Sequence, residues 1–242
     1  MIDRFLKYQI NIFVNTDSIV PEPNIISKLL ELFKNDGLIP STIYEMGPAG
    51  QTFRLRMSTT DNRWSIAFLS RNINIEHLGE NEPQKDEMDN FLTTAKKLTN
   101  KIFGYLGQKS NRLAFIVDFI LKEMDQAKLE SCYSKFFEPL PTYQKKSPFE
   151  WNNRSVSQED ISLAGTTEKM NVITEIKRMK AQIISKEKEI KKLERIFIQY
   201  EINTIPENKE TRFGVEQFGN FVDIANEKYS QIFSELESRI ND

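Results

Sequence analysis

The 242-residue chain has one histidine, His77, and one cysteine, Cys132, two residue types that often act in catalysis. A catalytic histidine needs a partner that orients its ring, and a metal site needs further ligands nearby. His77 shares the apolar face of a predicted strand with Ile73 and Ile75, while Glu76 points to the opposite face. Cys132 has no neighbouring base in KLESCYSKFF that would lower its thiol pKa. We therefore predict that His77 is a packed or solvated residue at the end of its strand, that Cys132 is a buried structural thiol, and that no catalytic, metal or cofactor site is built on them.

A second arrangement that is able to do chemistry combines Asp160 with Glu175 and Lys177 on a possible strand. In metal-dependent nucleases, carboxylates hold Mg²⁺ and a lysine positions or activates the attacking water. The Glu-x-Lys spacing recurs at 189–191 and 207–209, as expected in a chain rich in both residues. A solvated charged segment is therefore the favoured interpretation, and a nuclease-like enzyme using these three residues is the alternative hypothesis.

Three arginines form a candidate binding surface. Arg54 and Arg56 share the polar face of one predicted strand, and Arg63 begins the next strand. Arginines two residues apart in a strand project side by side, and their guanidinium groups bind carboxylates or phosphates well. Antiparallel sheets also often leave one face in water, so a merely solvated face is the alternative. We take Arg54, Arg56 and Arg63 as the candidate partner-binding residues.

Composition bounds the class of protein. Hydrophobic residues make up 39% of the chain, which is enough for a core, and the formal net charge is −2. A dedicated nucleic-acid binder usually carries a basic excess, so this balance disfavours nucleic acid as the partner. A single cysteine cannot form an intramolecular disulfide, and no apolar run has the length of a signal peptide core or a membrane span. The sequence therefore predicts a cytoplasmic protein without a membrane partner.

The first half of the chain alternates between strand and helix patterns. Apolar residues recur with a period of two in several segments and at helical spacing in two others. Leu113–Leu121 is apolar nearly throughout and predicts a central strand buried on both faces. The predicted strands before it are Tyr8–Val14, Ser41–Glu45, Phe53–Met57, Trp64–Phe68 and Ile73–Leu78, and the predicted helices are Ile25–Phe33 and Met88–Leu106.

The second half is harder to interpret. Asp125–Phe137 predicts a short helix and Phe149–Val156 a strand, and Ser157–Glu168 is polar and loop-like. Met170–Glu201 fits either a helix with imperfect heptads or a hairpin of Met170–Ile184 with Glu194–Thr204 around a charged turn. Val215–Ile240 predicts a long amphipathic helix whose apolar side must dock on the sheet or on a partner.

These elements predict an α+β fold, with a mainly antiparallel sheet, helices packed on one face and a long C-terminal helix. We divide the chain into an α+β half at 1–122, a proline-containing connection at 123–165, and a hairpin (or helix) plus C-terminal helix at 166–242. The last part is expected to pack on the first half as one unit.

Four segments of the chain resemble a known family. They are RWSIAFLSRNINIEHLG at Arg63–Gly79, the helix containing Phe91, LAFIVDFI at Leu113–Ile120 and FIQYEINT at Phe197–Thr204. In this strand order and apolar pattern the chain resembles a sporadically distributed family of uncharacterised bacterial proteins that are often encoded near mobile or defence loci. The resemblance implies the hairpin at Met170–Thr204, which we adopt, and it implies no activity.

The sequence thus favours a non-enzymatic protein-interaction protein of the bacterial cytoplasm, with a role as a defence or mobile-element accessory suggested by the resemblance. The scarcity of catalytic residue sets and the apolar stripe of the last helix support this prediction. The expected partner is another protein or a further copy of the chain.

Overall fold

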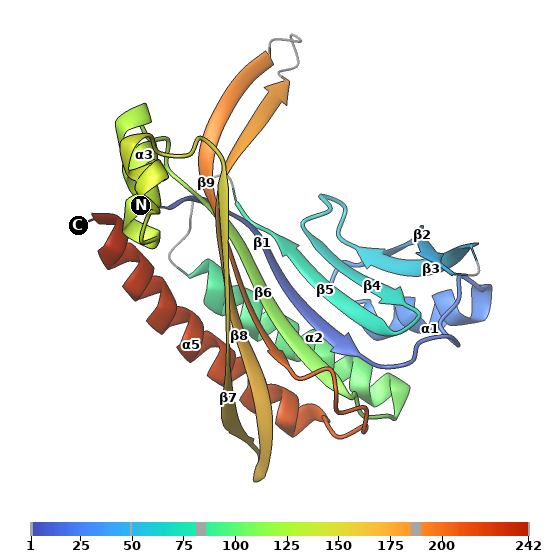
Figure 1. Cartoon of the computed structure of the whole chain (residues 1–242). Helices are drawn as coiled ribbons and strands as arrows, with labels where there is room; N and C mark the ends of the chain where they lie inside the picture. Colours follow the sequence, from blue (N-terminus) through green and yellow to red (C-terminus); the bar gives the residue numbers. More distant parts are fainter. Residues whose placement is uncertain (1, 49, 81–85, 185–189, 242) are drawn as a thin grey trace.

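The computed structural model describes residues 2–48, 50–80, 86–184 and 190–241. Its strands form one nine-stranded sheet in the order β2-β3-β4-β5-β1-β6-β9-β8-β7, and every neighbouring pair is antiparallel (Figure 1). The bounds are β1 Ile2–Phe13, β2 Ile39–Gly47, β3 Gly50–Ser58, β4 Trp64–Leu69, β5 Asn72–Leu78, β6 Arg112–Leu121, β7 Trp151–Leu163, β8 Thr166–Ile184 and β9 Ile190–Thr204.

The longer helices cover one face of this sheet. These are α1 (Pro23–Phe33), α2 (Glu87–Leu106) and α5 (Val215–Asn241), while α3 (Gln126–Phe136) and α4 (Pro141–Lys145) lie at one end of the sheet beside β7 (Figure 1). Helix α2 is capped by Gly107, whose positive φ of 64° is the left-handed conformation common at the C-terminal ends of helices. The predicted α+β class, with helices on one face and a long C-terminal helix, is confirmed.

Aromatic side chains join the helices to the sheet. Phe91 of α2 stacks on Tyr8 of β1, and Phe233 of α5 packs edge-on against Phe119 of β6. Tyr229 of α5 makes a similar contact with Tyr200 of β9. Tyr8 lies on the face that the apolar alternation of its strand predicted, because that face must leave water. Burial of such large side chains contributes about 1.5–3 kcal/mol each before entropy is counted.

Strand β6 lies next to the middle of the sheet, between β1 and β9, and most of its side chains on both faces are buried, as the run LAFIVDFIL predicted. Its pairing with β9 joins the strands of the first half of the sequence to those of the second half in one sheet. Residues from all three predicted ranges therefore contribute strands to the same sheet, and β7 lies within the range taken as a connection.

The hairpin interpretation of Met170–Thr204 is confirmed by the pairing of β8 with β9, and the long-helix alternative is wrong. The charged turn of that hairpin, 185–189, lies outside the described residues. The loop predicted at Ser157–Glu168 is wrong, because β7 and β8 run through it as a second hairpin. Its turn is Ala164–Gly165, both with positive φ (48° and 84°), the backbone conformation that joins strands in tight two-residue hairpins.

The face of the sheet without helices is polar. Amide side chains form a ladder across three strands, in which Gln158 donates to Asn171 and Asn171 donates to Asn203. Asp118 accepts from Gln199 and forms an ion pair with Lys7, at 3.3 Å. This face is therefore largely polar on β1, β7, β8 and β9, whereas Ala114 and Ile120 of β6 are buried on it.

Candidate protein interface

The three residues of the nuclease hypothesis are not brought together. Asp160 pairs with Lys169, whereas Glu175 pairs with Arg154 further along the same two strands. Six positions of β8 separate the two carboxylates, which corresponds to about 20 Å at a rise of about 3.3 Å per residue. Lys177 lies 3.6 Å from Glu175 and forms an ion pair with it. Among the described residues, no group of three or more His, Cys, Asp or Glu side chains is placed to hold a metal ion.

His77 is buried among aromatic rings. Its imidazole packs against Trp64, with ring centroids 4.6 Å apart, and stacks on Tyr8 at 6.1 Å. Burial lowers the pKa of His77, because desolvation disfavours the charged ring, and the positive charge of Arg63 adds to this. The neutral imidazole thus behaves as a member of the core, as the sequence predicted.

Cys132 is also a core residue. Its thiol lies 3.7 Å from the sulfur of Met124 on the inner side of α3. Burial raises the pKa of this thiol, which opposes formation of the nucleophilic thiolate. A structural role follows for Cys132.

Arg54 does not lie on a solvated face. Only 8% of its side chain is exposed, and its Nε donates to Glu45 of β2 at 2.8 Å. A second nitrogen donates to Asp17, in the segment after β1, at 3.2 Å. The side chain therefore closes an internal ion pair between the outer two strands, which corrects the prediction that it is a free anchor for a partner.

Glu45 is the centre of this buried network. Ser70 donates to its carboxylate from both the backbone nitrogen and the hydroxyl group. Burial opposes the charged form, but the hydrogen bonds from Ser70 and Arg54 outweigh it and lower the pKa of Glu45. The carboxylate is thus ionised and internally satisfied, so it presents no free charge at the edge of the sheet.

The other two candidate arginines are more accessible. Arg56 is half-buried and lies opposite Ser41 of β2, on the same polar face as Arg54. Arg63 is also partly exposed, and it pairs with Glu80 and lies 4.0 Å from Asp61. Arg56 therefore stays available beside the outer strand, whereas Arg63 is engaged in local ion pairs at the start of β4.

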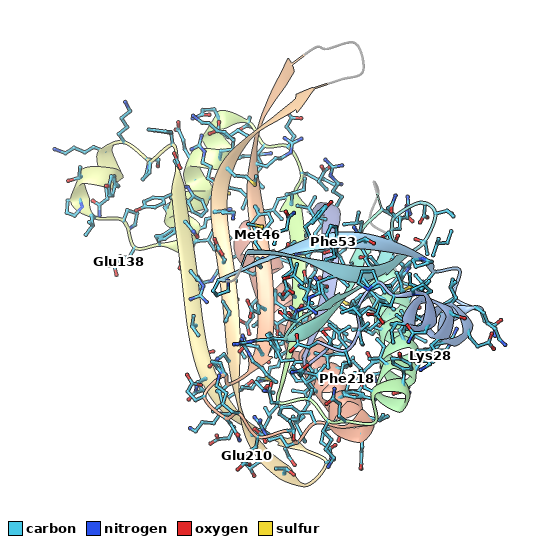
Figure 2. The ribbon with its side chains drawn as sticks, turned by 90° about the vertical axis from the view of Figure 1, so that its right-hand side faces the viewer. Lys28, Met46, Phe53, Glu138, Glu210 and Phe218 are labelled. Carbon is cyan, nitrogen blue, oxygen red and sulfur yellow. The ribbon has the colours of Figure 1, made fainter. Side chains whose placement is uncertain are left out.

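Among the side chains that the structure describes, the largest group of exposed apolar ones on the sheet lies on the β2–β3 hairpin. Tyr44, Met46 and Phe53 are 59%, 77% and 54% exposed, and Figure 2 labels Met46 and Phe53 on this hairpin. Tyr44 pairs with Phe53 across the two strands, and their ring centroids are 4.8 Å apart. On β3 the same face continues into Leu55, which is buried. An apolar row thus runs from the core out to the edge of the sheet.

Strand β2 is an outer strand, so one side of its backbone has no neighbour in the sheet. Its pairing with β3 is unbroken from Ile39 to Gly47, where the pair Gly47 with Gly50 closes a short turn. Hydrogen-bonded and non-hydrogen-bonded pairs alternate in such a hairpin, so the N–H and C=O groups of Thr42, Tyr44 and Met46 point outward. Pro40 falls in the same outward set, where its missing N–H costs no bond to β3.

The sequence reasoning did not select Tyr44, Met46 or Phe53. The sequence pattern identified the strands that carry them, but an apolar residue in a strand is normally expected to lie in the core. The signal that separates them from core residues is strand order, because only a residue at the edge of the sheet lies beyond the covering helices. That order depends on pairings distant in sequence.

Comparison with known proteins adds no relative: no family model and no curated protein matches the chain. Within the described residues, no helix is both long enough and apolar enough to cross a bilayer. The interpretation of the outer strand therefore depends on its own geometry.

Proposed function

We propose that this protein is a non-enzymatic interaction protein that binds its partner by adding a strand to the outer edge of β2. The observation that carries the proposal is the combination of an uninterrupted outer strand, no free charge along it, and the exposed row of Tyr44, Met46 and Phe53. Unpaired backbone groups supply affinity in strand addition, and alternate side chains supply specificity.

Outer strands in monomeric proteins are normally protected by charged side chains, bulges or covering elements. The only charged residue of β2 is Glu45, and Arg54 and Ser70 already bind it. Aromatic residues and methionine are enriched at protein interfaces. The exposed side chains of the hairpin have this composition, which favours an interface over an accidental apolar edge.

The separation of Asp160 from Glu175 supports interaction over the nuclease hypothesis, because the metal site of that hypothesis requires the carboxylates to converge. Arg56, beside Ser41 on the polar face of the same strand pair, stays a predicted contact at the margin of the interface. A setting in the bacterial cytoplasm near defence or mobile loci stays a prediction from the family resemblance.

The test is affinity capture from a native extract with three versions of the full chain. The Met46→Lys variant places a charge in the exposed row of β2, and the Val156→Lys variant places the same charge on β7, where Val156 is 50% exposed. Both sites are exposed, so each change should alter stability by less than about 0.5 kcal/mol.

We expect proteins that co-purify with the wild type to be lost with Met46→Lys and retained with Val156→Lys. Equal recovery by all three versions, with folding verified by circular dichroism, would remove the outer edge of β2 as the binding surface.

A further inference from the structure

We infer that the strand added to β2 is the β2 strand of a second copy, running antiparallel about a two-fold axis at Tyr44. This inference rests on the proposed function, since it names the partner of the same edge. It makes the protein a homodimer whose sheet continues from one copy into the other.

The outward backbone groups of β2 are suited to this pairing. With Tyr44 opposite its own copy, Thr42 lies opposite Met46, and these three residues have their N–H and C=O groups free for a partner. The three residue pairs (44 with 44, 42 with 46, and 46 with 42) form about six hydrogen bonds, two for each hydrogen-bonded pair. The next outward position places Pro40 opposite Pro48, and neither proline has an N–H, so the ladder ends there without a lost donor.

Charge also favours a second copy. In this register Glu45 lies opposite Ile43, so the only charged residue of the strand never meets its own copy. Like charges directly opposite each other in a sheet are destabilising, and this arrangement avoids them. A basic or acidic peptide from another protein would find no unpaired charge on β2, because Arg54 already neutralises Glu45.

The exposed row becomes continuous across the axis. Tyr44 and Phe53 already pair in each copy, and the two-fold operation brings the second Tyr44 next to the first. Four aromatic rings then lie in one line, with Met46 of each copy beside the Thr42 of the other. Side chains opposite each other in an antiparallel pair are close enough to contact, and aromatic pairs contribute favourably.

The register is tested by cysteine cross-linking of the full chain. A Tyr44→Cys variant should form an intermolecular disulfide under mild oxidation, since hydrogen-bonded partners lie about 5.5 Å apart between Cα atoms, within the range that a disulfide spans. Wild-type protein is the first control, because its only thiol, Cys132, is buried. Val156→Cys, on the opposite outer strand, is the matched exposed control.

Two further variants make the test specific for the pairing. Thr42→Cys and Met46→Cys should each cross-link poorly alone and efficiently when mixed, because residue 42 faces residue 46 of the other copy. Cross-linking of Val156→Cys as strong as that of Tyr44→Cys would overturn the assignment, because it would reflect random collision or pairing through β7.

Sedimentation of the unmodified protein keeps the inference testable if the cysteine changes weaken the pairing. We expect a reversible dimer whose dissociation constant rises about tenfold or more with Met46→Lys and stays unchanged with Val156→Lys. Protein that remains monomeric at the highest soluble concentration overturns the dimer. If Met46→Lys still abolishes capture of another protein in that case, the proposed function stands with a different partner.

Discussion

The two outer strands of the sheet, β2 and β7, differ in how they meet solvent. β7 carries Arg154, Glu159 and Asp160, and Glu159 extends to Lys228 of α5 in an ion pair of 2.9 Å. β2 carries only Glu45, which is held inside the sheet by Arg54. Charged side chains on an outer strand discourage pairing with another chain. One sheet thus has a protected edge and an edge with an intact, uncharged ladder, and this difference points to β2 as the binding edge.

The largest effect on this comparison should come from Arg54→Ala. Removing the guanidinium leaves the partly exposed Glu45 with only the hydrogen bonds from Ser70, so we expect a loss of about 1–2 kcal/mol in the free energy of unfolding. Chemical denaturation measures this loss, and sedimentation should show weaker dimerisation because β2 then carries a free charge.

The double variant Arg54→Leu with Glu45→Leu is the control for Arg54→Ala. It removes both charges and should recover part of the stability, since a buried ion pair replaced by apolar residues is often neutral. A stability loss as large as that of Arg54→Ala would show that packing, and not the unpaired charge, dominates at this site.

We expect a smaller effect from pH, which should change the stability of the fold but not the affinity of the dimer. Because burial lowers the pKa of His77, the unfolded chain binds a proton more readily than the folded protein. The stability that the neutral ring contributes is fully present above the unfolded pKa of 6.5, and it is lost as the pH falls through the lower folded pKa. Thermal unfolding from pH 8 to pH 5 should therefore show a decline below about pH 6.5 that is weaker in His77→Gln.

Dimerisation over the same pH range should change little while the protein stays folded, because Glu45 has a lowered pKa and stays ionised and paired. A dimer affinity that followed the titration of His77 would place part of the interface on β5 instead of β2.

We expect the smallest effect from salt. The dissociation constant of a dimer formed through an uncharged strand should vary by less than about twofold between low and moderate salt, because no exposed charge pair is formed. Titration of the dimer by sedimentation at several salt concentrations measures this. A strong weakening by salt would indicate that Arg56, and not the backbone of β2, anchors the partner.

Much of the fold could be predicted from local patterns. The alternation around Ile10, Ile66 and Ile75 identified strands because each buries one face under helices. Only the first part of β7 was predicted, as the strand at Phe149–Val156, and the rest was taken as a loop because Ser155 and Ser157 are exposed on the face that would normally be apolar. The clearest local signal there was Gly165, a residue that readily adopts positive φ, between two polar segments.

The candidate site was less predictable than the fold, because it depends on contacts between distant residues. Arg54 has the pattern of a solvated residue, and it is buried because Asp17 and Glu45 converge on it. Tyr44 and Phe53 have the pattern of core residues, and they are exposed because their strands lie beyond the helices. In both cases the burial of a residue follows from strand order, which the periodicity of a single strand does not specify.

The central position of β1 also has a consequence for how the chain folds. Tyr8 pairs with His77 on one side and Val117 on the other, both far along the chain, so the strand stays unpaired until long loops close. Sheets assembled from such distant segments fold slowly, because the chain loses entropy when it closes the long loops, before the stabilising contacts between the strands form. During that interval the apolar face of β1 is exposed and prone to aggregate. Folding yield should therefore fall with protein concentration during refolding, and a chaperone that shields extended apolar segments should raise it.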